Sequence, residues 1–243
     1  MGELNERLSR ISTQWMMVFQ AHGEGETDVS SAQRQLLERY SGAVYRYLLG
    51  AVRDADVAEE LAQEFALRFV RGDFRRADPE RGRFRDYLKT AVIHLVTDYH
   101  RSRQAAPIPL ASQAAEVVAA AESIVAEPDF LANWREELLQ RTWRALAQAQ
   151  PDYHAILLHR VENPDATSAQ AAEELQARLQ KPISAAAVRK AVQRAHTKFA
   201  ELLVNEVAAS LDKPTPEELV EELRALDLLK YCKSAVERRN PMT

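Results

Sequence analysis

The sequence has little glycine and almost no cysteine. Seven glycines among 243 residues are about half the usual share, whereas alanine occurs 39 times, a composition that favours helices over turn-rich sheets. We therefore expect an all-α protein and exclude an all-β sandwich. The single cysteine, Cys232, excludes an internal disulfide and every zinc or iron–sulfur pattern that needs several cysteines. This usage predicts a reducing compartment, the cytoplasm.

Long hydrophobic runs are missing as well. The first ten residues are polar and no later stretch approaches 18 consecutive apolar residues, so we expect neither a signal peptide nor a membrane span. The chain also has no nucleophile and base pair, glycine-rich phosphate loop or metal motif. The candidate metal ligands His94, Asp98 and His100 do not lie on one side of their helix. His94 and Asp98 share a face, but His100 lies about 120° away from His94. We expect a protein that is not an enzyme, with no cofactor and no metal site.

The charges are unevenly distributed. The net charge of −4 argues against a nucleic-acid partner, but residues 178–200 contain six cations and no acid. Residues 54–64 contain five acids and neither lysine nor arginine. This segregation predicts separate surfaces for separate partners, one of them polyanionic.

Prolines and polar breaks divide the chain into two small helical domains. We expect an N-terminal extension over 1–30, a helical domain over 31–105, a linker over 106–130, a second helical domain over 131–210 and a C-terminal extension over 211–243. In the second domain the pattern predicts four helices, with Thr167 or Ser168 and then Ser184 as N-caps. One amphipathic helix is expected in the C-terminal extension, over 217–231.

The first segment of functional interest is the acidic helix 54–71. Val57, Leu61, Phe65 and Phe69 form its buried stripe, and Glu60, Gln63 and Glu64 fall on the opposite side. Leu67 lies in the middle of that polar face, and an apolar centre with a rim of carboxylates is typical of a protein-binding surface. The alternative is a solvated helix face.

The second segment covers 72–103. Beyond a charged loop, its helix presents Thr90, His94, Thr97, His100 and Arg101 opposite an apolar stripe. Hydrogen-bonding groups, cations and aromatic rings together suit single-stranded nucleic acid, whose phosphates attract cations and whose unstacked bases need partners. The alternative is an exposed helix with internal salt bridges.

The third segment, 167–204, is predicted as a helix, a short turn and a second helix. Val188, Val192, Ala195, Phe199 and Leu202 point inward. Arg189, Lys190, Gln193, Arg194 and Thr197 form the outer face. This pattern indicates a helix-turn-helix whose second helix enters a DNA groove. The alternative is a helical hairpin within a bundle.

Three stretches, in this order, resemble the extracytoplasmic-function group of bacterial RNA polymerase sigma factors. They are AEELAQEFALRFV at 58–70, FRDYLKTAVIHLVTDYHRSR at 84–103 and SAAAVRKAVQRA at 184–195. The resemblance covers roughly residues 30–105 and 131–205. It implies a sigma region-two bundle and a helix-turn-helix region-four domain, which recognise the minus-ten and minus-thirty-five promoter elements.

The resemblance also implies three sets of site residues. The polymerase-binding set is Glu59, Glu60, Gln63, Glu64 and Leu67. The minus-ten set is Arg83, Arg85, Tyr87, Lys89, Thr90, His94, Thr97, Arg101 and Arg103, with the loop 72–82 receiving a flipped base. The minus-thirty-five set is Ser184, Ala185, Ala186, Arg189, Lys190, Gln193, Arg194 and Lys198. His94, Tyr87, Ala191 and His196 depart from residues common in the family, so no promoter sequence is implied.

The expected partners are core RNA polymerase and promoter DNA, with no membrane. Further candidates are an anti-sigma protein and the protein's own C-terminal extension. The helix at 217–231 is acidic, and we hypothesise that it shields the cationic segment 178–200. The alternative is that Leu219, Leu223 and Leu226 extend the core of the second domain. The competing function is a helix-turn-helix regulator whose first 103 residues form a sensing or dimerising bundle.

Overall fold

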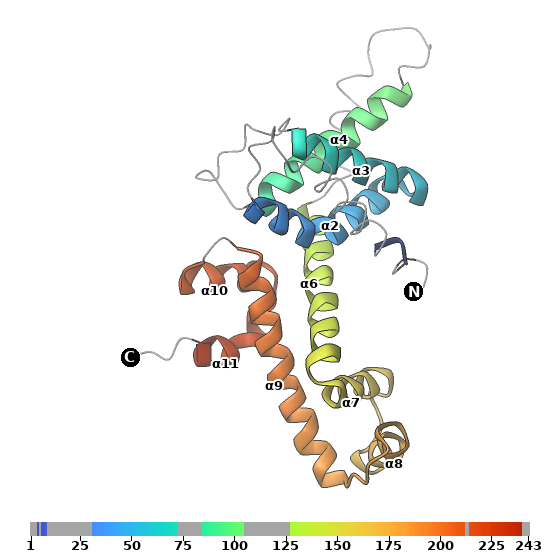
Figure 1. The fold of residues 1–243 in the computed structure, drawn as a ribbon, viewed down its shortest axis with the longest axis vertical. Coiled ribbons are helices and arrows are strands. Elements are labelled where there is room, and N and C mark those ends of the chain that lie inside the picture. Colours follow the sequence, from blue (N-terminus) through green and yellow to red (C-terminus); the bar gives the residue numbers. More distant parts are fainter. Residues whose placement is uncertain are drawn as a thin grey trace. The chain divides into compact units, whose positions relative to one another are not determined.

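The computed structural model describes residues 4, 6–8, 31–71, 84–104, 127–211 and 214–239. Every regular element in these ranges is an α-helix, in agreement with the expected all-α fold (Figure 1). The contacts divide the chain into two units, Met1–Glu137 and Leu138–Thr243. Among the described helices, none is both long and apolar enough to cross a membrane.

Unit 1 contains three long helices, α2 (Ser31–Val52), α3 (Ala55–Arg71) and α4 (Phe84–Gln104). Arg53 adopts a left-handed backbone conformation, at φ 55°, and so separates α2 from α3. The Asp54 carboxylate then accepts hydrogen bonds from the backbone N–H groups of Asp56 and Val57, which caps α3. The apolar stripes of the three helices meet in a core that includes Leu48, Phe65 and Leu88. This core positions the outer faces of α3 and α4.

The first half of α6 (Glu127–Ala149) also belongs to unit 1. Trp134 stacks on Tyr40 of α2 with 3.9 Å between ring centroids, and Phe130 meets Tyr47 edge to face at 5.6 Å. We expected residues 131–137 in the second domain, whereas the unit boundary falls inside α6. Two aromatic pairs with α2 bury this half of α6. Such ring pairs stabilise the packing of the two helices by more than the buried apolar area alone.

A buried ion pair joins the same two helices. The Arg46 guanidinium donates to the Glu137 carboxylate at 2.7 Å, and both side chains are more than nine-tenths buried. The carboxylate lies directly over Gly42, where a Cβ would collide with it. Gly42 therefore allows α6 to approach α2 closely enough for the pair to form.

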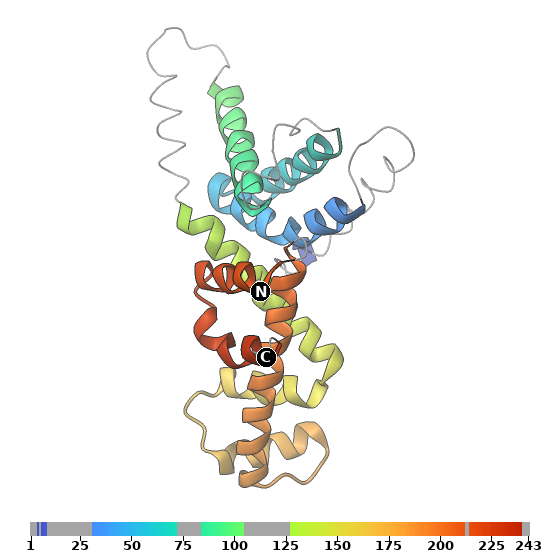
Figure 2. The same cartoon turned by 90° about the vertical axis from the view of Figure 1, so that its left-hand side faces the viewer.

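Unit 2 is arranged along its longest helix, α9 (Ala185–Ala209). Both Figure 1 and Figure 2 show α7 (Pro151–Glu162) and α8 (Ser168–Leu179) beside the N-terminal part of α9. Thr167 caps α8 through a capping box with Gln170, and the Ser184 hydroxyl caps α9 by accepting from the backbone N–H of Ala187. The structure therefore contains the two predicted helices joined by a short turn, capped by Thr167, one of the two predicted caps of α8, and by Ser184, the predicted cap of α9.

The C-terminal extension differs from its prediction. Instead of one helix over 217–231 there are two, α10 (Pro216–Ala225) and α11 (Leu229–Arg239), separated by a turn with Asp227 at φ 53°. Both pack on α9 (Figure 2). Leu219, Leu223 and Leu226 are buried, as the alternative interpretation expected, because the turn lets both short helices bury their apolar sides.

Candidate protein and nucleic-acid interfaces

The outer face of α3 carries most of the predicted polymerase-binding residues. Glu60 is exposed, and Gln63, Glu64 and Leu67 are half-exposed on the side of α3 away from Leu61 and Phe65. Glu60 and Gln63 make no hydrogen bond or ion pair with any residue that the structure describes. The half-exposed Leu67 therefore lies among polar groups that remain available to a partner.

Two arginines modify the charge of this face. Arg68 donates to the Glu64 carboxylate at 2.7 Å, and this hydrogen bond raises the pKa of Arg68 further above its usual value. Arg7 of the N-terminal extension contacts Asp56 at 2.9 Å and Glu59 at 3.5 Å. The side chain of Glu59 is only 13% exposed. Glu59 is consequently less accessible than the sequence predicted, and the exposed acidic centre is Glu60.

The outer face of α4 presents the predicted hydrogen-bonding row. Thr90, His94, Arg101 and Arg103 are exposed, whereas Lys89 and Thr97 are half-buried. Each threonine hydroxyl donates to the carbonyl four residues earlier, Thr90 to Asp86 and Thr97 to Ile93. Their oxygens remain available as acceptors, because a hydroxyl carries two lone pairs besides its proton.

Aromatic and acidic neighbours position the cations at the end of α4. Arg103 donates to the Tyr99 hydroxyl at 2.8 Å and lies over the ring, 5.7 Å from its centroid. Asp98 contacts Arg68 at 3.4 Å and Arg101 at 4.0 Å. These exposed ion pairs are weak and exchange readily for phosphate contacts.

Three members of the minus-ten set behave differently from the rest. The Arg85 side chain is buried and contacts Asp86 at 3.5 Å, so in this structure it is not on the exposed face. Tyr87 is half-buried, and burial raises the pKa of its hydroxyl to about 12, which keeps it protonated as a donor. Arg83 and the loop 72–82 lie outside the described residues.

The N-terminal half of α9 carries a group of unpaired cations. Arg189, Lys190 and Arg194 are exposed and make no hydrogen bond or ion pair with any described residue. Gln193 and Ala186 are exposed on the same side, and Ala185 at the start of the helix is half-buried. Exposed cations on the second of two helices that are joined by a short turn are suited to DNA phosphates and base edges.

The other three cations of the 178–200 segment are paired. Arg178 contacts Glu162 at 3.8 Å, Lys181 contacts Asp152 at 2.9 Å and Lys198 contacts Glu201 at 3.7 Å. The acid-free run in the sequence is therefore partly neutralised in space by acids of α7 and of α9. Lys198 is correspondingly a weaker candidate for DNA contact than Arg189, Lys190 and Arg194.

The hypothesis that the C-terminal extension shields the DNA-binding face is wrong. Arg238 contacts Glu201 at 3.3 Å and Arg239 donates to Asn205 at 2.6 Å, so α11 docks on the C-terminal half of α9. Arg189, Lys190 and Arg194 remain exposed in the N-terminal half. The acidic α10 is held elsewhere because its buried leucines determine where it packs.

The comparisons with known proteins bear on unit 1. Residues 36–106 match the family model of Sigma-70 region 2. The matched segment includes α2 from residue 36 onward and the whole of α3 and α4, and therefore both outer faces described above. The match covers less than a third of the chain and shows that this segment is similar to Sigma-70 region 2. Sigma region 2 binds core RNA polymerase and promoter DNA. No curated protein and no solved structure matches the chain.

Proposed function

We propose that this protein is a sigma factor of the extracytoplasmic-function type, which directs core RNA polymerase to promoters and opens them. The observation that carries the proposal is a combination in one chain. A region-2 match contains an accessible acidic and apolar face, and a second unit presents unpaired cations on a helix-turn-helix. In this interpretation the chain has no active site of its own, and the polymerase performs the chemistry.

In this proposal α3 binds the polymerase. Leu67 supplies an apolar centre, and Glu60 and Gln63 supply unpaired polar groups at its edge. An interface of this kind gains affinity from the apolar centre, while the carboxylates steer the encounter and select a cationic partner surface. A regulator that uses only a helix-turn-helix has no need for such a face.

The outer face of α4 is proposed to hold the separated strand of the minus-ten element. Arg101 and Arg103 attract phosphates, while His94 and the Thr90 hydroxyl contact the edges of unstacked bases. Unstacking a base costs a few kcal/mol, which these contacts offset. The duplex of the minus-thirty-five element is bound separately, by Arg189, Lys190, Gln193 and Arg194 on α9.

The deciding experiment reverses the charge of the α3 face. The double variant Glu60→Lys with Glu64→Lys should lose affinity for core polymerase by roughly tenfold or more, because it places cations where the partner requires acids. Both side chains lie outside the core, so the helical circular dichroism signal should not change. Binding is measured by co-elution with core polymerase and by titration.

A matched control comes from α10. The variant Glu217→Lys with Glu221→Lys makes the same charge change at the same spacing on another exposed helix face, and it should bind core polymerase as the parent does. If the α3 variant binds polymerase and supports initiation like the parent, the assignment of α3 is wrong. The helix-turn-helix regulator then becomes the better interpretation.

A further inference from the structure

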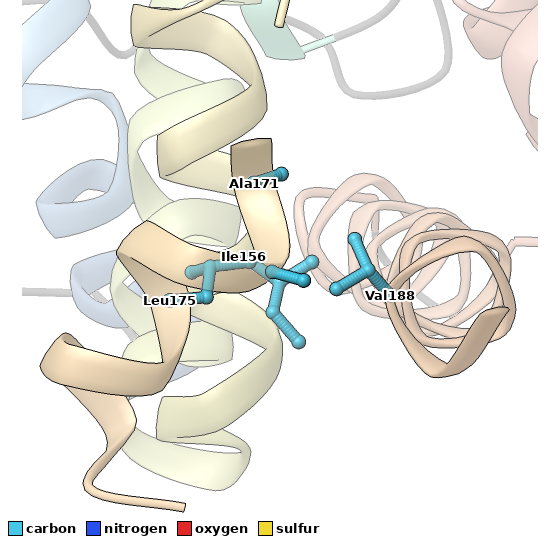
Figure 3. Close-up of a cluster of buried hydrophobic side chains, with 5 residues drawn as sticks. Ile156, Ala171, Leu175 and Val188 are labelled. Carbon is cyan, nitrogen blue, oxygen red and sulfur yellow. The ribbon is translucent and has the colours of Figure 1, made fainter. Parts of the chain in front are cut away.

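An open hollow of about 340 Å³ is lined by α7, the start of α8 and the N-terminal half of α9. Its floor is apolar. Figure 3 shows Ile156, Ala171 and Leu175 gathered opposite Val188 of α9. These side chains are buried and belong to one hydrophobic cluster, so the hollow has a preformed base that does not depend on a ligand.

Two arginines from different helices lie on the polar part of the lining. Arg160 comes from α7 and Arg189 from α9, and both are exposed. Arg160 donates to the carbonyl of Ala166 at 2.9 Å, which holds the guanidinium beside the start of α8. Its remaining N–H groups and all those of Arg189 have no partner among the described residues. The lining contains no acidic residue.

The other polar groups around the hollow already have partners. The Thr167 side chain is engaged with Gln170 in the capping box of α8. His159 Nε2 lies 2.8 Å from a carboxylate oxygen of Glu174, and because a carboxylate only accepts, this nitrogen carries the proton. The positive charge available to a ligand therefore comes from Arg160 and Arg189.

These features fit one class of ligand. A divalent metal needs oxygen or neutral nitrogen ligands, and two cations would repel it. An oxyanion fits, because guanidinium groups bind phosphate through charge-assisted hydrogen bonds. Since Arg189 also lies on the proposed DNA-binding face, the most accessible source of phosphate is the DNA backbone.

We propose that Arg160 and Arg189 hold one backbone phosphate of the promoter duplex over this hollow. This makes Arg160, on the helix that precedes the helix-turn-helix, a positioning contact that determines how α9 enters the groove. The inference rests on the proposed function of unit 2 and adds a residue that neither the sequence analysis nor the family match assigned.

The test uses the full chain and a short mixed-sequence DNA duplex, since a phosphate contact carries no direct sequence information. The variant Arg160→Ala should weaken binding roughly tenfold and lower the slope of log affinity against log salt by about 0.9. Arg160→Lys should restore much of the slope, because it keeps the charge. The matched control is Arg178→Ala, which removes one cation of the same unit that is paired with Glu162 and lies outside the hollow.

A second measurement changes the DNA as well as the protein. Duplex phosphates are replaced one at a time by neutral methylphosphonate. At one position the replacement should weaken DNA binding by the parent and have no further effect on DNA binding by Arg160→Ala. The proposed phosphate contact would be overturned if Arg160→Ala and Arg178→Ala gave equal slopes of log affinity against log salt, or if no such phosphate position were found. Binding of inorganic phosphate that Arg160→Ala abolishes, with an unchanged DNA slope, would assign the hollow to free phosphate instead. If the parent binds no duplex at all, alone or with core polymerase, it is the proposed function of unit 2 that fails.

Discussion

At the scale of single residues, the presence of an ion-pair partner determines how available a charged side chain is to nucleic acid. Arg178 and Arg189 belong to the same acid-free segment, yet Arg178 faces Glu162 whereas Arg189 has no partner among the described residues. An exposed ion pair stabilises by only about 0–1 kcal/mol, but it lowers the potential that a phosphate meets. The unpaired arginine is therefore the better candidate for a nucleic-acid contact.

The buried pair between Arg46 and Glu137 gives a prediction about stability. Arg46→Met removes the 2.7 Å partner of a buried carboxylate and should destabilise the contact between α2 and α6 by about 3–5 kcal/mol. Hydrogen exchange of the α2 amides measures this change locally. A local measurement is needed because a chain with two units has no single well-defined free energy of unfolding.

The double variant Arg46→Met with Glu137→Met is the control. It removes both charges and should recover most of the lost stability, since a buried ion pair contributes little beyond an apolar pair of similar volume. Equal destabilisation in the single and double variants would mean that the packing of these side chains, rather than their charge, is what matters.

Cys232 gives a prediction about pH. Its side chain is buried in α11, and burial raises the pKa of the thiol from 9.0 to about 11. The folded state therefore binds the thiol proton more tightly than the unfolded state. Its contribution to stability is complete below about pH 9 and is lost as the pH rises towards 11.

Alkylation by iodoacetamide at pH 8 is the measurement. The rate should be far lower for the folded chain than for the chain in urea, because only the exposed thiolate reacts. Cys232→Ala should abolish labelling altogether. Rapid labelling without denaturant would show that α11 opens frequently.

At the scale of elements, short helices persist here only because they pack. The ten residues of α10 are too few to form a stable helix alone. The Thr215 capping box and the burial of Leu219, Leu223 and Leu226 hold the helix in place. Its acidic outer face follows from this packing, so the charge of α10 does not reveal where the helix binds.

Deletion of residues 212–243 tests this interpretation. The deletion exposes apolar residues of α9, including Leu203, Val204 and Val207, that are buried in the full chain. We expect faster hydrogen exchange in the C-terminal half of α9 and no gain in DNA affinity, because Arg189 and Lys190 are already exposed. Fluorescence anisotropy with a DNA duplex is the measurement. Tighter binding that fades at high salt would restore the shielding hypothesis.

At the scale of the whole molecule, the region-2 match ends before the structural unit does. The match stops at residue 106. Beyond it, Phe130 and Trp134 of α6 pack on Tyr47 and Tyr40 of α2. Helix α6 then continues into unit 2. The unit boundary therefore falls inside α6, after Glu137, and not in the predicted linker 106–130.

Two fragments test this boundary. The fragment 31–137 should unfold at a temperature at least about 10 °C above that of 31–106, because burying two large aromatic side chains stabilises by roughly 3–6 kcal/mol. Thermal circular dichroism provides the comparison, and Trp134→Ala in the longer fragment is the control that removes the main contact. Equal midpoints for both fragments would place the first half of α6 outside unit 1.

Much of this protein could be predicted from local sequence. The spacing of apolar residues predicted α3 and α4 within a residue or two, Ser184 was predicted as the cap of α9, and Thr167 was one of two predicted caps of α8. Helix α9 ends at Ala209, five residues beyond the predicted segment 167–204. These features depend on residues a few positions apart, which interact within one turn of helix. The exposure of Glu60, His94, Arg189 and Lys190 follows from the same periodicity.

Contacts across long sequence distances were decided by the tertiary structure. Arg46 and Glu137 are 91 residues apart, and nothing in the sequence near either one indicates that they meet. In the same way, packing alone buries Arg85, pairs Lys181 with Asp152, brings Arg160 and Arg189 to one hollow and docks α11 on the distal half of α9. A sequence pattern shows which face of a helix is buried, but the choice among possible partners for that face depends on complementary shape and on the burial of charge, which exist only once the helices have packed.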